Sequence, residues 1–175
     1  MMGGVGSPEG FEDWYRREHG RLVSALTVAA GDADVAQDLV SEAFARALER
    51  WDRVSTMDSP TGWVRQVAVN LLRRRHRRAA LERRLLGRAP DRTSECPSPT
   101  VDPDLWAAVM ALPQQQRAVL GLRLVLDLSQ AETARLLGIR PGTVSATLLA
   151  ARRTVGVALS SDGSPGASYS EVDHG

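Results

Sequence analysis

The chain has 175 residues, of which 43% are hydrophobic and 25% charged, and its 22 basic residues, all Arg, nearly balance 21 Asp and Glu. This composition is typical of a globular protein in water, and no apolar run reaches the roughly 20 residues that a membrane span needs. The N-terminus lacks the charged start and apolar stretch of a secretion signal, so we expect a cytoplasmic protein. The single cysteine, Cys96, can form neither an internal disulfide nor a metal cluster by itself.

Two amphipathic helices are predicted first. Apolar residues keep helical spacing over residues 11–30, where Gly31 ends the run, and again over residues 32–51. The second helix carries a row of carboxylates at i, i+4 and i+8 on another face, formed by Asp34, Asp38 and Glu42. Like charges at this spacing repel one another by roughly a few tenths of a kcal/mol per pair. The row is therefore either a solvated face or a docking surface for a basic partner.

The third predicted helix is strongly basic. Ser59 can cap it, Pro60 suits its first turn, and apolar residues between Trp63 and Leu72 form a stripe to be buried. Residues 61–92 hold ten Arg against two acidic residues, whereas residues 1–60 hold eleven Asp and Glu against six Arg. Arginines that neutralise phosphates release counterions from DNA, and Arg and Asn also suit base edges. The helix is thus a candidate DNA-binding surface, with a solvated basic helix or a general RNA-binding arm as alternatives.

The chain divides after this helix. Residues 87–103 contain four prolines and almost no large apolar side chain, which predicts an extended linker between two helical halves. Residues 160–175 are rich in Ser and Gly, which predicts a disordered tail. The three histidines, His19, His76 and His174, have no partners at metal-ligand spacing, so neither a metal nor another cofactor is predicted.

The second half contains a helix-turn-helix signature. Ser129 and Glu132 match a capping box, Gly138 supplies a left-handed residue at the helix end, and Pro141 suits the start of the next helix. The second helix of such a motif usually enters the major groove of DNA. An ordinary helical hairpin is the alternative.

Four segments, taken in order, carry a resemblance to a known family. They are Asp-Val-Ala-Gln-Asp-Leu-Val-Ser-Glu-Ala-Phe at 34–44, Pro-Thr-Gly-Trp-Val-Arg-Gln-Val-Ala-Val-Asn at 60–70, Leu-Pro-Gln-Gln-Gln-Arg-Ala-Val-Leu at 112–120, and Leu-Gly-Ile-Arg-Pro-Gly-Thr-Val at 137–144. Together they resemble the extracytoplasmic-function (ECF) sigma factors, which belong to the main bacterial sigma-factor superfamily. The resemblance extends from residue 11 to about residue 159.

The resemblance implies an all-α protein with two small helical domains joined by a flexible linker. A region 2 domain would span residues 9–86, the linker 87–101, a region 4 domain with the helix-turn-helix 102–159, and the tail 160–175. It also implies a transcription initiation factor without enzymatic activity, cofactor or membrane insertion. Its partners would be core RNA polymerase, promoter DNA and an anti-sigma factor.

The resemblance assigns three sets of site residues. Docking on the clamp helices of the largest polymerase subunit falls to Asp34, Asp38, Leu39, Glu42 and Phe44. Minus-10 recognition and melting falls to Ser55, Thr56, Asp58, Trp63, Asn70, Arg73, Arg74 and Arg77. Unstacking a base costs free energy, which a shaped pocket and a basic surface must offset. Minus-35 recognition falls to Arg140, Thr143, Ser145, Ala146, Thr147, Leu149, Arg152 and Arg153. Apolar surface near Leu112, Val119, Leu120 and Leu124 would bind the flap of the second-largest subunit, and the linker would pass through the polymerase. Most of these apolar residues must also close a small four-helix core, and the sequence does not separate core from docking surface.

The recognition helix departs from the family pattern. Where the family commonly has Lys-Ser-Arg-Leu-His-Arg-Ala-Arg, this chain has Ser-Ala-Thr-Leu-Leu-Ala-Ala-Arg at 145–152. DNA affinity falls with the number of phosphates that a protein neutralises, so we expect weak minus-35 binding. A sigma-like interaction protein that binds polymerase or an anti-sigma partner is therefore kept as a second hypothesis. A third, an enzyme such as a nuclease, finds no metal-ligand spacing, phosphate loop or activated nucleophile to support it.

Overall fold

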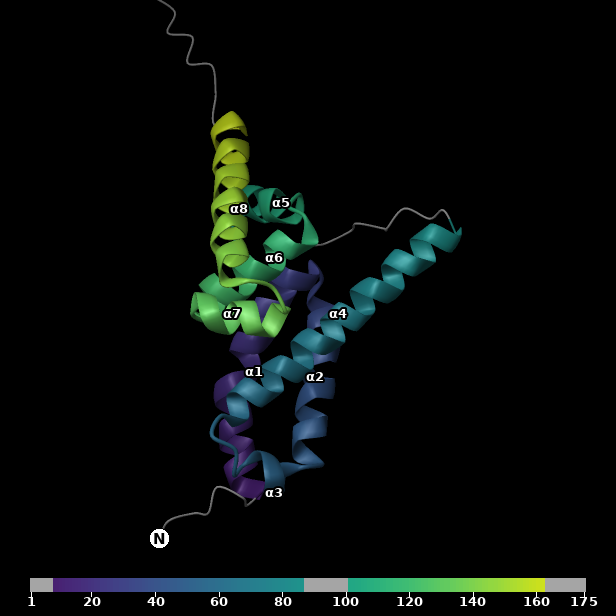
Figure 1. The fold of residues 1–175 in the computed structure, drawn as a ribbon, viewed down its shortest axis with the longest axis vertical. Helices are drawn as coiled ribbons and strands as arrows, with labels where there is room; N and C mark the ends of the chain where they lie inside the picture. Colours follow the sequence, from purple (N-terminus) through teal and green to yellow (C-terminus); the bar gives the residue numbers. More distant parts are fainter. Residues whose placement is uncertain (1–7, 87–100, 163–175) are drawn as a thin grey trace, which may run out of the picture.

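The computed structural model describes residues 8–86 and 101–162, and within these ranges every regular element is a helix (Figure 1). The elements are α1 (Pro8–Ala30), α2 (Ala33–Leu48), α3 (Trp51–Val54), α4 (Pro60–Leu86), α5 (Pro103–Met110), α6 (Gln114–Leu120), the π-helix η1 (Gly121–Val125), α7 (Gln130–Leu137) and α8 (Pro141–Asp162). The predicted all-α fold is confirmed. Most of the predicted linker, Cys96 and all but the first residues of the predicted tail lie outside the described residues. Residues 160–162, predicted to belong to that tail, continue α8.

Local sequence signals set several helix ends, and Gly31 and Ser59 act as predicted. The predicted helix over residues 32–51 instead ends at Leu48, and Trp51 begins the short α3. Gly31 follows α1 with φ 79°, a left-handed conformation that glycine adopts without steric cost. The Asp32 carboxylate accepts a hydrogen bond from the Val35 N–H at 2.9 Å and caps α2. The Ser59 hydroxyl accepts one from the Gly62 N–H at 3.0 Å and caps α4. Each cap satisfies a backbone donor that the helix itself leaves without a partner.

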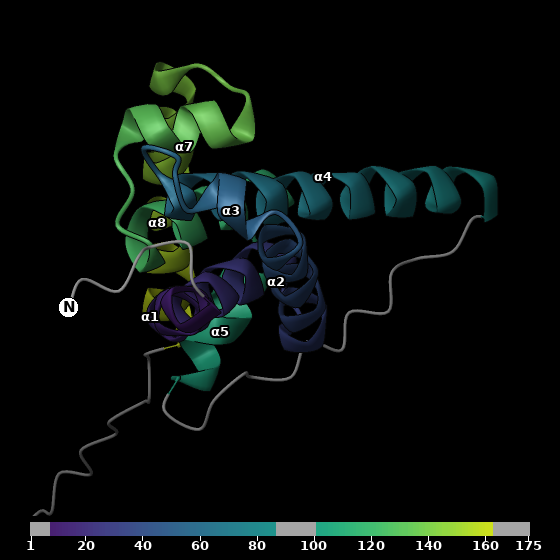
Figure 2. The same ribbon diagram turned by 90° about the horizontal axis from the view of Figure 1, so that it is seen from below.

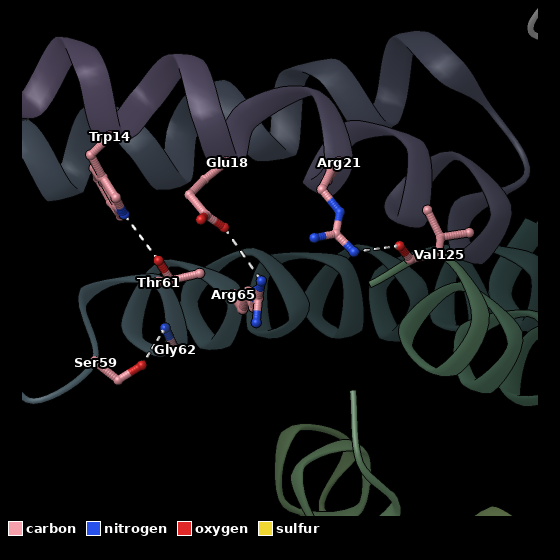
Figure 3. Close-up of polar contacts among 8 residues, drawn as sticks. All are labelled: Trp14, Glu18, Arg21, Ser59, Thr61, Gly62, Arg65 and Val125. Atoms are coloured by element: carbon pink, nitrogen blue, oxygen red, sulfur yellow. Dashed lines mark hydrogen bonds and ion pairs between the residues drawn. The ribbon is translucent and has the colours of Figure 1, made fainter. Parts of the chain in front are cut away.

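The first half, α1 to α4, is built around aromatic side chains. Trp14 stacks on Trp51 with ring centroids 5.0 Å apart, and Phe11 meets both Trp51 and Phe44 edge to face. The indole N–H of Trp14 donates to the Thr61 hydroxyl at 3.0 Å, which fixes the start of α4 against α1 (Figure 3).

The second half, α5 to α8, closes two smaller clusters. Leu112, Leu120 and Ala151 join α6 to α8, while Val119, Ala134 and Val144 join α6, α7 and α8. All six side chains are buried, so the helix-turn-helix is held from inside by apolar packing.

The two halves are not separate bodies in this structure. Five apolar side chains from the second half belong to the same buried cluster as the core of α1, α2 and α4: Ala118, Leu122, Leu126, Leu128 and Leu136. The Pro-rich segment between α4 and α5 led us to predict two domains joined by a flexible linker. Nothing in the sequence pattern predicted this shared core. The shared core places η1 and α6 directly on α1.

Helix α4 extends beyond the other helices. In Figures 1 and 2 its C-terminal part runs as a straight rod away from the body of the molecule. Leu81 and Leu85 on this part are 56% and 74% exposed. The rod carries most of the arginines of the basic segment into solvent.

Candidate nucleic-acid interface

The acidic row on α2 lies on the surface. Asp34, Asp38 and Glu42 are all exposed, and Glu42 forms an ion pair with Arg46 one turn on. The predicted docking residues Leu39 and Phe44 instead lie inside, at 8% and 2% exposure. Leu39 and Phe44 were predicted to contact polymerase directly, and this prediction is wrong. Both side chains are packed inside the core and cannot also contact a partner. They hold α2 in place so that the carboxylates face outward.

The loop between α3 and α4 divides its predicted residues in a similar way. Thr56 and Asp58 are exposed and Trp63 is half-buried against the core. Ser55 is 7% exposed, and its hydroxyl donates to the Asp52 carbonyl at 3.4 Å. The burial of Ser55 corrects its assignment as a direct DNA contact. The Thr56 hydroxyl also donates to the backbone, to the Arg53 carbonyl at 2.9 Å, but Thr56 and Asp58 stay exposed at the surface.

The basic face of α4 presents the remaining minus-10 residues. Asn70, Arg73, Arg74 and Arg77 are exposed and share one face, since their spacing follows the helical repeat. The Gln66 side-chain amide donates to the side-chain oxygen of Asn70 at 3.2 Å, and this hydrogen bond orients the Asn70 side chain. The face is anchored from behind by the ion pair between Glu18 and Arg65, 3.3 Å long and largely shielded from solvent (Figure 3).

The helix-turn-helix has the predicted local geometry. The Ser129 hydroxyl accepts from the Glu132 N–H at 3.2 Å, and the Glu132 carboxylate accepts from the Ser129 N–H at 2.8 Å. Hydrogen bonds from the Ser129 side chain and backbone lower the pKa of Glu132. Gly138 ends α7 with φ 65°, and the Gln130 amide donates to the Pro141 carbonyl at 2.7 Å. These contacts fix α8 relative to α7.

The outer surface of α8 carries few cations. Seven of the eight predicted minus-35 residues are exposed and Thr147 is half-buried. Ser145, Ala146 and Leu149 make the early turns small or apolar, and Leu149 is 51% exposed. Arg152 lines a groove between α1, α5 and α8. Arg152 therefore lies on the side of the recognition helix that faces α1 and α5.

That groove has a volume of about 850 Å³ and is mostly apolar, with Val23, Leu105 and Val155 among its lining residues. Three of the four predicted flap-binding residues are interior: Leu112, Val119 and Leu120 are between 0% and 7% exposed. These three form the core of the second half, which decides between the two roles that the sequence left open for them. Leu124, which is 53% exposed and lines the groove, is the one that remains accessible.

No group of three His, Cys, Asp or Glu side chains could hold a metal ion among residues 8–86 and 101–162. Burial and the neighbouring cations Arg117, Arg75 and Arg83 lower the pKa of His76 to about 4, so this imidazole is neutral at pH 7. Each helix in the same part of the chain is too short or too polar to cross a membrane.

The two halves match two family models. Residues 14–82 match Sigma-70 region 2, and residues 104–155 match Sigma-70, region 4. The fold therefore belongs to the sigma-70 class of proteins. The RNA polymerase sigma-E factor of Streptomyces antibioticus is 31% identical over 140 residues, which cover 79% of this chain and 78% of the relative. The sigma-E factor of Streptomyces coelicolor is 29% identical over 140 residues, with 79% of each chain covered.

Solved structures show the same fold. Sigma factor RpoE from Bartonella quintana, in complex with the anti-sigma factor NepR, aligns with a TM-score of 0.75 at 20% identity, over 88% of this chain and 99% of that one. CnrH in complex with the cytosolic domain of CnrY aligns with a TM-score of 0.60 at 23% identity, over 91% and 94%. The chain belongs to the ECF family of RNA polymerase sigma factors. It is a sigma factor that acts in transcription initiation, in a family of non-catalytic factors that bind core polymerase.

Sequence reasoning missed the residues that join the two halves. Gly121 and Ala25 carry no chemical signal, and Arg21 is one arginine among 22. Their proximity depends on the angle between α1 and α6, which periodicity along each helix does not specify.

Proposed function

We propose that this sigma factor docks on polymerase through α2, opens the minus-10 element with α4 and its preceding loop, and makes only a weak contact to the minus-35 element through α8. The observation that carries the proposal is the exposed basic face of α4, anchored to α1 by Trp14 and Glu18. A rigid helix with an aligned row of donors is suited to hold a separated DNA strand.

Docking on the clamp helices of the largest subunit is assigned to Asp34, Asp38 and Glu42. All three carboxylates are exposed in one row on a helix whose opposite side is fixed in the core. Complementary charge at an interface rim raises the association rate and fixes register more than it adds affinity. We therefore expect a basic partner surface and a salt-dependent association rate. The flap of the second-largest subunit is assigned to the exposed Leu124 side of the groove.

Promoter opening is assigned to Asn70, Arg73, Arg74 and Arg77, with Thr56 and Asp58 at the loop where the unpaired base is held. The cost of unstacking one base is a few kcal/mol by order of magnitude, and stacking and phosphate contacts must supply it. Trp63 is half-buried at the edge of this surface and can offer part of its ring. The factor itself needs no catalytic group for this step, and it works in the cytoplasm, where polymerase meets DNA.

A second role is favoured by the small, apolar recognition helix. A protein with an intact first half but few cations on α8 can bind polymerase or an anti-sigma factor without productive minus-35 contact. Both solved structures described above are complexes with a partner protein. The partner of Bartonella quintana RpoE is the anti-sigma factor NepR. We include an anti-sigma factor among the partners of this chain on that similarity.

Transcription from a library of upstream regions separates the two roles. The purified chain is mixed with Streptomyces coelicolor core polymerase and the transcripts are sequenced. Specific start sites support the promoter-specificity role, while polymerase binding without specific starts supports the interaction role.

The α4 assignment is tested on a promoter found in this way. We expect Asn70→Ala with Arg73→Ala to reduce permanganate reactivity of the minus-10 bubble more than it reduces core binding. Arg75→Ala is the matched control, because a rotation of about 100° per residue places Arg75 well away from the Asn70 face of the same helix. A normal bubble in the double variant would show that the basic face is not the minus-10 surface.

A further inference from the structure

We propose that the groove between α1, α5 and α8 binds a free medium-chain fatty acid, with the hydrocarbon chain inside the groove and the carboxylate at Arg152. The proposal goes beyond the proposed function, because the ligand of this site is neither polymerase nor DNA. Three features support it: the volume and apolar walls of the groove, wall hydroxyls that are already bonded, and a single cation at the wall.

The groove is large enough for a small molecule and is mostly apolar. Its volume of about 850 Å³ lies within the range of roughly 300–1,000 Å³ that is typical of small-molecule sites. Helix α1 contributes Val23 and Val28 to the walls, α5 contributes Leu105 and Val109, and α8 contributes Val155. A hydrocarbon chain against such walls removes apolar surface of both partners from water, which favours binding.

The hydroxyl groups of the α1 wall are already used within that helix. The Ser24 hydroxyl donates to the Gly20 carbonyl at 3.0 Å, and the Thr27 hydroxyl donates to the Val23 carbonyl at 2.9 Å. A sugar, a nucleotide or an extended peptide would carry polar groups into the groove and find few hydrogen-bond partners on these walls, which is costly. The walls therefore select a ligand whose buried part is a hydrocarbon chain.

Arg152 supplies the charge that selects the head of the ligand. It is the only ionisable side chain among the described residues that line the groove. None of the ion pairs formed within residues 8–86 and 101–162 includes Arg152, and its side chain is exposed. A guanidinium presents a planar fork of donors that matches a carboxylate. One anionic head on a hydrocarbon chain is the chemistry of a fatty acid.

Gly156 leaves the α8 wall open beside this cation. A Cβ atom built on Gly156 meets nothing within 4 Å, so a side chain there would project into open space. Gly156 lies four residues after Arg152, and both line the groove from the same face of α8. A chain that runs from the Arg152 guanidinium into the groove therefore passes Gly156. Because several helices line the groove, such a chain must leave a membrane to enter it, and the ligand is the free acid.

The groove also includes Leu124, whose exposed side chain is assigned to the polymerase flap under the proposed function. An acid in the groove and a flap on its rim would compete for this side chain. The acid site is therefore tested on the full chain without polymerase. Failure of the acid site then leaves the flap assignment standing, and failure of the flap assignment leaves the acid site standing.

The first test measures binding of octanoate and decanoate to the parent chain by isothermal calorimetry, below their micelle concentrations. Each buried methylene contributes about fourfold in affinity, so we expect decanoate to bind roughly 15-fold more tightly than octanoate. In ¹H–¹⁵N spectra the indole N–H signal of Trp106, which lines the groove, should shift, while those of Trp14 and Trp51 in the aromatic core should not. No binding, or equal affinity for the two acids, would overturn the proposal and favour a helical peptide as the occupant.

The second test fills the gap at Gly156. The variant is Gly156→Leu, and Gly142→Leu is the matched control, because both glycines lie in α8 and a Cβ on either meets nothing within 4 Å. Only Gly156 lines the groove. We expect Gly156→Leu to bind decanoate roughly 15-fold more weakly, which corresponds to about two methylenes excluded, and the control to bind like the parent. Equal affinities for the two variants would place the acid elsewhere and overturn the proposal.

The third test exchanges the charge on both sides of the contact. The parent should bind decanoate more tightly than decylamine, and Arg152→Glu should reverse this order. We expect the ratio of the two affinities to change by at least about fivefold, since an exposed ion pair changes affinity by up to about fivefold and a repulsion replaces it. Arg135→Glu, at an exposed arginine of α7 outside the groove, makes the same change in net charge and should keep the parent order. An unchanged order in Arg152→Glu would overturn the placement of the carboxylate.

A membrane is the other source of the same chemistry. We expect the parent chain and Gly156→Leu to cosediment equally, if at all, with phosphatidylglycerol vesicles. Cosedimentation that Gly156→Leu abolishes would show that the groove takes a lipid chain from the bilayer, and would overturn the free acid as its ligand.

Discussion

Reversing the charge of the acidic row should weaken polymerase binding while leaving the fold intact. The change is Asp38→Arg with Glu42→Arg, at two exposed positions one turn apart on α2. Exposed ion pairs contribute about 0.2–1 kcal/mol each, and reversal replaces two attractions with two repulsions of similar size. The expected loss of binding free energy is therefore about 1–4 kcal/mol, roughly 5-fold to 900-fold in Kd.

The same change should cost the free chain little stability. It removes the Glu42 to Arg46 ion pair, whose side chains are 50% and 38% exposed, and it places arginines one turn apart on a solvated face. Pairs of this kind change helix stability by about 0.2–0.5 kcal/mol each. The helical circular dichroism signal and the midpoint of thermal unfolding should thus stay close to those of the parent.

Fluorescence titration of core polymerase, repeated at several salt concentrations, measures the effect. The control is Glu12→Arg with Asp13→Arg, which makes the same change in net charge at two exposed acidic positions on α1. We expect the control to keep the parent affinity and the α2 variant to lose affinity most strongly at low salt, since screening weakens exposed charges. Equal affinities for the α2 variant and the control would refute the assignment of the acidic row to docking.

Two further substitutions test the second half. Ser129→Ala should lower the free energy of unfolding by about 1 kcal/mol at pH 7, measured by chemical denaturation, with Thr154→Ala on exposed α8 as the control. The cap bond from the Glu132 N–H to the Ser129 hydroxyl does not titrate. Hydrogen bonds from Ser129 also hold the pKa of the Glu132 carboxyl below its ordinary value, so the part of the difference that depends on this carboxylate is present above the unfolded-state pKa and is lost as pH falls through the folded-state pKa. An undiminished difference between parent and variant well below pH 4 would contradict this account. Ser145→Lys with Thr147→Arg should tighten minus-35 binding and make it more sensitive to salt. The slope of log K against log salt concentration should steepen by up to about 1.8, at roughly 0.9 per added phosphate contact. An unchanged slope in a titration of the full chain would show that these positions face no phosphate.

The sequence alone determined that the chain is helical and where several of its helices begin or end. Ser59, Ser129 and Gly138 act through hydrogen bonds and backbone conformation within a few residues, so their effects are visible in the sequence itself. The position of the acidic row and the basic face could be predicted for the same reason, because helical periodicity fixes which residues share a face. The family motifs then gave each face its proposed partner.

Only the tertiary structure decided which motif residues reach the surface. Leu39, Phe44 and Ser55 belong to the same predicted site sets as exposed residues, yet each is buried. The contact of Gly121 with Ala25, nearly a hundred residues apart, depends on the angle and distance between two helices. Those quantities follow from how all the side chains of both halves pack together, and the pattern along either helix does not contain them.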